Sequence, residues 1–346
     1  MAVPGYKRRA TLAVALVTGL NAAPSAAMAD AIVALTGPTS NAGSIDLTTA
    51  DGSYGGLVTV GSTTGYSLWG LLGGANSSSP TSPIYGDITT STPVGDNGKN
   101  AILRYYVLAT SSNGSQSLIS LGEIDPRFSG SATPDLVTVS GNTASLNFTL
   151  PGAAGRDLAN LTSLQLLSAP ALAGIGGQST SVSLAGNVSF PGAYKFQGAD
   201  PNNVAPITQT VNGDTYTGPA LFSLIDPSDP NILNQYVITA GTDGYEVVLS
   251  LAELDPAFGA STALNQIDMV PFADTMTDFP GSGIARTILP GDTPFAHGRW
   301  ESNLDLIDVV AVPEPPSAAL LIPGLFGVAL IGLRWRQKAT SRHRLP

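Results

Sequence analysis

Two ten-residue stretches decide how this chain folds: ISLGEIDPRF at residues 119–128 and LSLAELDPAF at residues 249–258. Around them, residues 102–128 align with residues 232–258 at a constant offset of 130 without a gap, and eleven of the 27 positions are identical. Identity at this level within one chain indicates an internal duplication. We therefore expect two copies of one structural unit.

The shared residues predict local structure. Asn113-Gly114 and Asp243-Gly244 lie between apolar runs, and such pairs tolerate the positive φ angles of a hairpin turn. Each hairpin is followed by Ser-x-x-Glu, the pattern of a helical capping box, and then by Asp-Pro, which ends the turn. We interpret Glu253 and Asp255 as the ends of a helical turn, because a catalytic carboxylate pair would need burial or a close partner.

The duplication extends beyond this segment. Leu150-Pro151-Gly152 matches Leu289-Pro290-Gly291, and Gly155-Arg156 matches Gly298-Arg299. Trp69 and Phe222 lie at matching places in apolar segments, so we expect them in the two cores. The domain boundaries follow: a first repeat at residues 30–167 with a Gly-, Ser- and Pro-rich insertion at 73–100, a linker at 168–178, and a second repeat at 179–310.

Composition excludes several classes of function. The chain has 346 residues, no cysteine and two histidines, so it has no disulfide, no cysteine nucleophile and no cysteine-ligated metal. Between Asp30 and Val312, seven basic residues face 24 acidic ones, a net charge of −17. Such a surface repels nucleic acid. Hydrolase and nucleotide-binding motifs are absent from the sequence.

The N-terminus predicts export. Lys7, Arg8 and Arg9 precede an apolar run, and Ala27-Met28-Ala29 then supplies a small-x-small cleavage pattern. We expect residues 1–29 to be a signal peptide that signal peptidase removes between Ala29 and Asp30.

The C-terminus, residues 312–346, predicts a membrane segment. Pro313, Glu314 and Pro315 precede an apolar stretch at 317–333, and a basic cluster follows that would stay cytoplasmic. This tail resembles the PEP-CTERM sorting signal of Gram-negative bacteria. The resemblance implies transient anchoring in the inner membrane, recognition by an exosortase, and release to the cell surface or the medium. A permanent C-terminal anchor is the alternative.

The order of motifs in the second repeat, TYTGPALFSLI, then DGYEVVLSLAELDPAFG, then LPGDTPFAHGRWESNL, resembles the oxidoreductase molybdopterin-binding domain of sulfite oxidases. The first repeat is a more diverged match. The resemblance implies an α+β, mainly β fold in two tandem copies. It also implies a pterin pocket partly built from the Gly-Arg segment, with His297, Arg299, Ser302 and Asn303 as the candidate contacts. From the residues alone, Arg299 could instead pair with a nearby carboxylate while Trp300 packs on the sheet.

One departure from this family is large. Sulfite oxidases hold molybdenum through a cysteine thiolate, and the chain has no cysteine. A thiolate is not exchanged for a hydroxyl or carboxylate without changing the metal's electronics. We therefore expect an exported envelope or extracellular protein that is not catalytic and holds no cofactor. Its expected role is binding or scaffolding, with extracellular polysaccharide as a partner. The alternatives are a molybdopterin-dependent oxidoreductase and a module that binds a small anion or a saccharide.

Overall fold

The computed structural model describes residues 30–39, 41–49, 54, 56–74, 101–126, 128–129, 133–195, 204–259, 268–271, 284–292 and 297–312. The expected signal peptide, the sorting tail with Pro313, Glu314 and Pro315, and nearly all of the 73–100 insertion lie outside these residues, as does Ala29. The described part is mainly β with short helical turns, as the sequence predicts.

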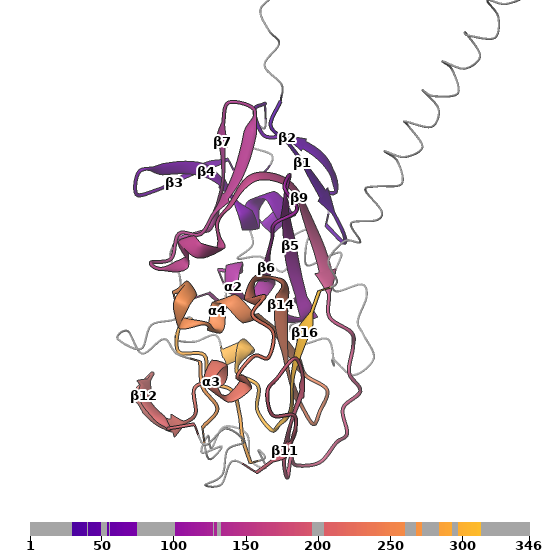
Figure 1. The fold of residues 1–346 in the computed structure, drawn as a ribbon, viewed down its shortest axis with the longest axis vertical. Helices are drawn as coiled ribbons and strands as arrows, with labels where there is room; N and C mark the ends of the chain where they lie inside the picture. The colour runs from indigo at the N-terminus through magenta and orange to yellow at the C-terminus, as the bar shows by residue number, and fades with distance from the viewer. Residues whose placement is uncertain are drawn as a thin grey trace, which may run out of the picture.

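The first repeat forms a curled sheet of nine strands (Figure 1, upper half). Seven of them follow the order β2-β1-β9-β8-β7-β4-β3, and β5 pairs with both β6 and β9. The strands are β1 (Ile32–Thr36), β2 (Gly43–Asp46), β3 (Leu57–Val60), β4 (Thr63–Ser67), β5 (Tyr105–Ser111), β6 (Gln116–Ser120), β7 (Leu136–Ser140), β8 (Thr143–Asn147) and β9 (Leu158–Ser168). The helical turns are η2 (Gly70–Gly74), η3 (Ala101–Arg104), α2 (Leu121–Ile124) and η4 (Ala153–Arg156).

The second repeat contains a five-stranded sheet, β11-β10-β16-β14-β15, and a separate hairpin, β12-β13 (Figure 1, lower half). Its strands are β10 (Val182–Gly186), β11 (Gly192–Tyr194), β12 (Ile207–Val211), β13 (Asp214–Gly218), β14 (Gln235–Gly241), β15 (Glu246–Ser250) and β16 (Leu304–Ala311). Its helical turns are α3 (Leu221–Ile225), η5 (Ile232–Asn234), α4 (Leu251–Leu254), η6 (Pro256–Phe258) and η8 (His297–Arg299).

The two repeats share one strand pairing. The first strand of each repeat runs parallel to the last, with Ala34 opposite Ser163 and Ser183 opposite Leu306. Gly37 directly follows β1 and Gly186 is the last residue of β10, and both glycines have positive φ. A Cβ at either glycine would overlap a carbonyl oxygen of the parallel strand. The same close approach at both sites explains the glycines and supports the duplication inferred from sequence.

A second shared detail lies in the last strand. β9 and β16 pair antiparallel with β5 and β14, and each pairing contains a bulge. Asn160 and Asn303 lie two residues before the unpaired positions of these bulges, with φ of 55° and 56°, in the left-handed region that asparagine tolerates. Their carbonyl oxygens accept N–H bonds from Ser112 and Thr242 over 2.9 and 3.1 Å. The hairpin turns predicted at Gly114 and Gly244 are confirmed, with φ of 88° and 81°.

The central strands β5 and β14 are buried on both faces because they lie between two apolar clusters. Val107 and Val237 point into the main core, which continues through both repeats, while Tyr106 and Tyr236 point into a smaller cluster. The two tyrosine rings stack across the repeats with centroids 4.7 Å apart. Strands buried on both faces read as near-continuous apolar runs, as these do. The repeats therefore pack on each other through their duplicated segments.

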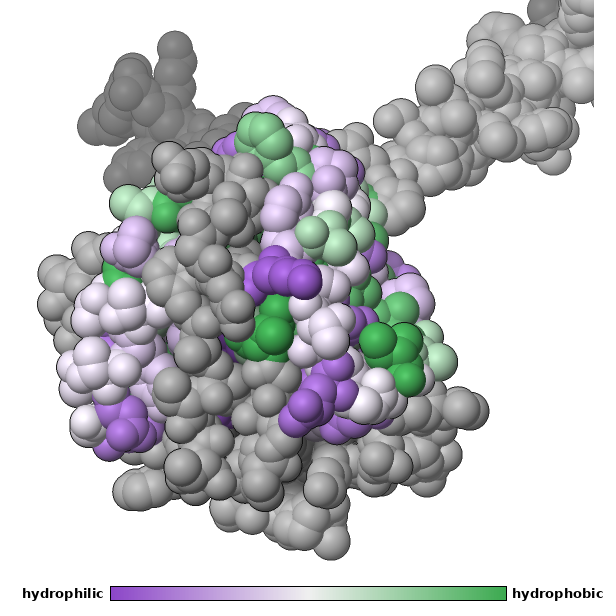
Figure 2. All heavy atoms as spheres, turned by 90° about the horizontal axis from the view of Figure 1, so that it is seen from below, coloured by the Kyte–Doolittle hydropathy of each residue, from purple (hydrophilic) through white to green (hydrophobic). Residues whose placement is uncertain are grey.

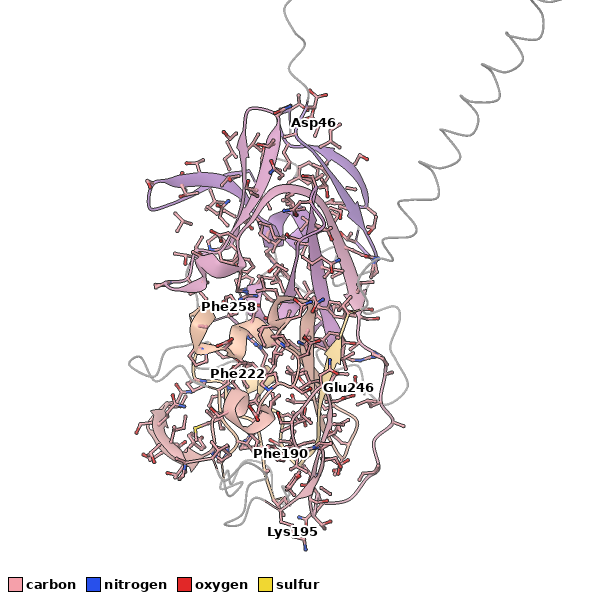
Figure 3. All side chains as sticks on the ribbon, viewed as in Figure 1. Asp46, Phe190, Lys195, Phe222, Glu246 and Phe258 are labelled. Carbon is pink, nitrogen blue, oxygen red and sulfur yellow. The ribbon has the colours of Figure 1, made fainter. Side chains whose placement is uncertain are left out.

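The expectation for the two aromatic residues is confirmed for Trp69, which is in the core, whereas Phe222 is half-buried against it. Asp46, the last residue of β2, and Lys195, the residue after β11, lie at opposite ends of the described part of the chain (Figure 3). Glu246 and Phe258 lie between these ends, near the contact of the repeats. Seen from the end formed by the second repeat, hydrophobic and hydrophilic side chains of the described residues occur in separate small groups (Figure 2).

Candidate functional site

The duplicated Ser-x-x-Glu motifs begin α2 and α4. Ser250 accepts the Glu253 N–H over 3.1 Å, and Glu253 in turn accepts the Ser250 N–H over 2.7 Å, so the predicted capping box is confirmed in the second repeat. In the first repeat, Ser120 accepts the Glu123 N–H over 3.2 Å, but the Glu123 carboxylate is directed elsewhere. Asp255 ends α4 and accepts the Ala257 N–H that opens η6.

The two motifs also bind each other. The Ser120 hydroxyl donates to Glu253 over 2.9 Å, and the Ser250 hydroxyl donates to Glu123 over 3.1 Å. These bonds are reciprocal, because each repeat donates one serine hydroxyl to a glutamate carboxylate of the other repeat. Such an exchange is expected when two copies of one segment meet across an approximate two-fold axis. α2 and α4 lie close together where the repeats meet (Figure 1).

Two buried arginines complete this junction. Arg156, at the end of η4, pairs with both oxygens of Glu123, one of them over 3.0 Å, and reaches Ser250 over 3.2 Å. Arg299, at the end of η8, pairs with Glu253 over 2.6 Å and with Asp292 over 3.2 Å. Arg156 and Arg299 come from the matching Gly-Arg motifs, and both are almost fully buried. We call these residues together with Ser120 and Ser250 the junction network.

Glycines let the repeats approach at this junction. A Cβ on Gly122 would lie 2.9 Å from the Cδ and Nε atoms of Arg299, in the other repeat. A Cβ on Gly155 would lie 2.9 Å from the Phe258 ring, again in the other repeat. Real Cβ atoms do not come this close to neighbouring atoms, so the two chain segments meet only because these side chains are missing.

Further buried carboxylates lie around the network, and burial is the main cause of their pKa shifts. Burial raises the pKa of Asp135 to about 7 and that of Asp292 to about 7. Burial also raises the pKa of Glu253, and it raises the pKa of Asp268 well above its usual range. Two arginines cannot neutralise this many carboxylates, so some of the carboxyl groups hold protons near neutral pH.

The four residues expected to contact a pterin have separate roles. Arg299 pairs with Glu253 and Asp292, which is the ion-pair interpretation of the sequence, while Trp300 donates to the Leu289 carbonyl over 3.0 Å. Ser302 accepts from Arg286 over 2.7 Å. Asn303 holds the linker: its amide donates to the Gly177 carbonyl and its oxygen accepts the Ser179 N–H. His297 begins η8, and its side chain is outside the described residues.

The residues present do not fit the molybdopterin of the resembled family. The Arg299 side chain is 4% exposed and both of its described partners are carboxylates of the protein. A pterin phosphate would need that cation to be accessible. The chain also offers no thiolate for molybdenum. Within the described parts of the chain, no group of three or more His, Asp or Glu side chains is arranged to hold a metal ion.

A pocket of about 220 Å³ lies beside the junction network in the first repeat. Its walls come from the end of β4, from α2 and from the segment before β7. Its lining includes Trp69, Glu123, Ile124, Thr133, Asp135 and Leu150.

No motif in the sequence marks Asp135 or its counterpart Asp268. The two aspartates occupy equivalent places in the two repeats. The carbonyl of Asp135 accepts the Leu68 N–H over 2.8 Å, and the carbonyl of Asp268 accepts the Leu221 N–H over 2.7 Å. The signal was weak, since the two short segments share only an aspartate and a valine two residues later. An alignment extended beyond Phe128 and Phe258 could have found it.

Comparison of the sequence with protein-family models, with curated proteins and with solved structures gives no match. Among the residues that the structure describes, no helix is long and apolar enough to cross a membrane. The expected anchor at 317–333 is outside that part of the chain.

Proposed function

We propose that this chain is an exported binding or scaffolding protein of the cell envelope or extracellular matrix, and that it is not a redox enzyme. In this proposal it consists of two tandem copies of a domain resembling the molybdopterin-binding domain of sulfite oxidases, and in both copies the cofactor chemistry has been lost. A PEP-CTERM-like tail sorts it through an exosortase in a Gram-negative bacterium, and extracellular polysaccharide is its partner.

One observation carries this proposal: Arg299, the cation expected to hold a pterin, is enclosed between Glu253 and Asp292. Its counterpart Arg156 is enclosed in the same way by Glu123. Two arginines at matching places with matching partners are explained by the packing of the repeats. Breaking a buried pair is costly, so neither guanidinium is free to bind a ligand.

The first test measures molybdenum and pterin in the chain as its native host exports it. We expect neither, because the Arg299 guanidinium is not accessible and no thiolate is present. Molybdenum near one per chain, together with the fluorescence of an oxidised pterin, would contradict the proposal and favour the alternative of a molybdopterin-dependent oxidoreductase. An exported preparation of a known molybdoenzyme from the same host serves as the positive control.

A second measurement tests export and sorting. The intact mass of the exported chain should correspond to a start at Asp30 and to loss of the residues after the Pro313-Glu314-Pro315 motif. Replacing Glu314 with Gln should leave the start unchanged and block the loss of the tail, because the resemblance assigns recognition to this motif. A mature chain that keeps residues 317–333 would instead indicate a permanent anchor.

A further inference from the structure

The pocket beside the junction network has a lining that selects for one chemical class. Its apolar walls come from Trp69, Ile124, Leu150 and two prolines, and its polar groups are hydroxyls and carboxyls. Among the lining residues that the structure describes, none is a lysine, arginine or histidine. An anionic ligand would meet two carboxyl groups and no cation on this described lining, which disfavours anions.

The carboxyls differ in what they can offer a ligand. Glu123 is paired with Arg156 through both of its oxygens and also accepts from Ser250. Asp135 accepts the Thr149 N–H through one oxygen, over 3.0 Å. Burial raises the pKa of Asp135 to about 7, so this group carries only part of a charge near neutral pH. A nearly neutral pocket favours hydroxyl groups over an ammonium group.

Size narrows the class further. About 220 Å³ is below the roughly 300–1,000 Å³ of sites that take drug-sized ligands. The space is suited to a single small ring. Leu150 lies at the rim with 42% of its surface exposed, so a ring in the pocket can continue into solvent at that side.

We propose that this pocket binds one neutral sugar unit of a polysaccharide, with Asp135 accepting hydrogen bonds from the sugar hydroxyls and the apolar walls packing on the C–H face of the ring. This inference rests on the proposed binding role and names the ligand class for it. The second repeat differs at this place: tryptophan is replaced by Phe222, and Ser67 by Ala220. The proposed site therefore belongs to the first repeat.

The test is saturation-transfer NMR on the exported chain with methyl glycosides of glucose, galactose, mannose and N-acetylglucosamine. Methyl glucuronide is the anionic comparison. We expect transfer to at least one neutral glycoside and none to the glucuronide. Transfer to the glucuronide alone, or to none of the sugars, would overturn the proposal.

Two variants locate the binding. Leu150→Trp should abolish transfer by filling the pocket from its exposed rim, and Leu57→Trp is the matched control, because Leu57 is 64% exposed and lies in β3, outside the pocket lining. Asp135→Asn keeps an acceptor for the Thr149 N–H and should weaken binding about tenfold through the altered hydrogen bond to the sugar. Binding that survives Leu150→Trp would show that the sugar binds elsewhere.

The sugar-binding proposal and the non-redox proposal can fail independently of each other. A chain without pterin that also binds no neutral sugar would refute the pocket and leave the non-redox role intact. A chain that contains pterin would refute the non-redox role, whatever the glycosides do.

Discussion

Arg156 and Arg299 occupy matching places in the two repeats, but their surroundings have diverged. Arg156 has one carboxylate partner, Glu123, and its guanidinium lies over the Phe148 ring at 4.1 Å. Arg299 has two carboxylate partners, because Asp292 stands where the first repeat has Ala153. Both repeats thus share the ion pair between the arginine and the glutamate of the helical turn α2 or α4. The second contact of the arginine differs: it is the Phe148 ring in the first repeat and Asp292 in the second.

The difference shows which part of the duplication is under structural constraint. Ser120 and Ser250 each donate a hydroxyl to a glutamate of the other repeat, and Arg156 reaches Ser250, so these contacts depend on both copies at once. A change in one copy would leave a buried group unpaired in the other. The groups beside the pairs differ between the copies: the first has the pocket beside Trp69, and the second has Asp292 beside its arginine, where Asp292 also forms a β-bridge with Ser129 of the first repeat.

The largest expected effect comes from removing Arg299. Arg299→Met leaves two buried carboxylates without their cation, and we expect a loss of about 3–5 kcal/mol in the free energy of unfolding at pH 8. Arg156→Met leaves only Glu123, which keeps the Ser250 hydroxyl, so its loss should be smaller. Urea unfolding of both variants measures the difference. An equal or smaller loss for Arg299→Met would contradict the role assigned to Asp292.

A second comparison lies on either side of the junction. Arg104 pairs with Glu246 of the other repeat over 2.9 Å and also donates to the Ala169 carbonyl at the start of the linker. The matching residues on the opposite side are Asn234 and Gln116, which carry no charge. An ion pair therefore stands on the side where the linker runs, and Glu246 accepts the Leu172 N–H of that linker.

Variants that replace this ion pair with the uncharged residues of the opposite side measure how much the pair stabilises the fold. Arg104→Asn or Glu246→Gln alone should cost about 3 kcal/mol, because each leaves a buried charge unpaired. The double variant copies the opposite side and should cost less than the sum of the two, since no charge remains unpaired. A double-mutant cycle in urea measures this coupling. Additive losses would mean that the pair contributes nothing beyond its separate contacts to the linker.

Much of the local structure could be predicted from the sequence, because it depends on neighbouring residues. The turns at Gly114 and Gly244 and the capping of α4 follow from spacing alone. The junction could not be predicted, because it depends on which surfaces of the repeats meet. The Glu123 side chain breaks its own capping box in order to pair with Arg156, 33 residues away. No local pattern contains that information.

The candidate site shows the same limit. The choice between a ligand-binding and an ion-paired Arg299 was open in the sequence, since both uses need the same residue in the same motif. In the structure, Arg299 is buried and pairs with Glu253 and Asp292, which favours the ion-paired interpretation. Asp135 was missed because a single aspartate before a strand has no distinctive pattern. Only its backbone contact to Leu68 and its counterpart Asp268 mark it.

A smaller effect is expected at Gly122, whose missing side chain leaves room for Arg299. Gly122→Ala should destabilise the fold by about 1–3 kcal/mol, because Arg299 is held by two carboxylates and cannot move away. The matched control is the reverse change at the counterpart position, Ala252→Gly, which adds no clash and should cost about 1 kcal/mol through helix propensity. Thermal unfolding separates the two, and a tolerated Gly122→Ala would show that Arg299 is not fixed.

The most gradual expected effect is the pH dependence that Asp292 adds to the second repeat. Burial raises its pKa to about 7 in the folded state, well above the usual value of 3.8, so the folded chain holds this proton more tightly than the unfolded chain. The stability from this group is fully present below pH 4 and is lost as pH rises toward 7, with a slope of roughly 1 kcal/mol per pH unit. Asp292→Asn should flatten the curve between pH 5 and 7, and Ala153→Asp in the first repeat should steepen it. Urea unfolding along this pH series measures the slopes. A slope unchanged by Asp292→Asn would place the titrating proton on another buried carboxyl of the network, with Asp135 the first to be replaced next.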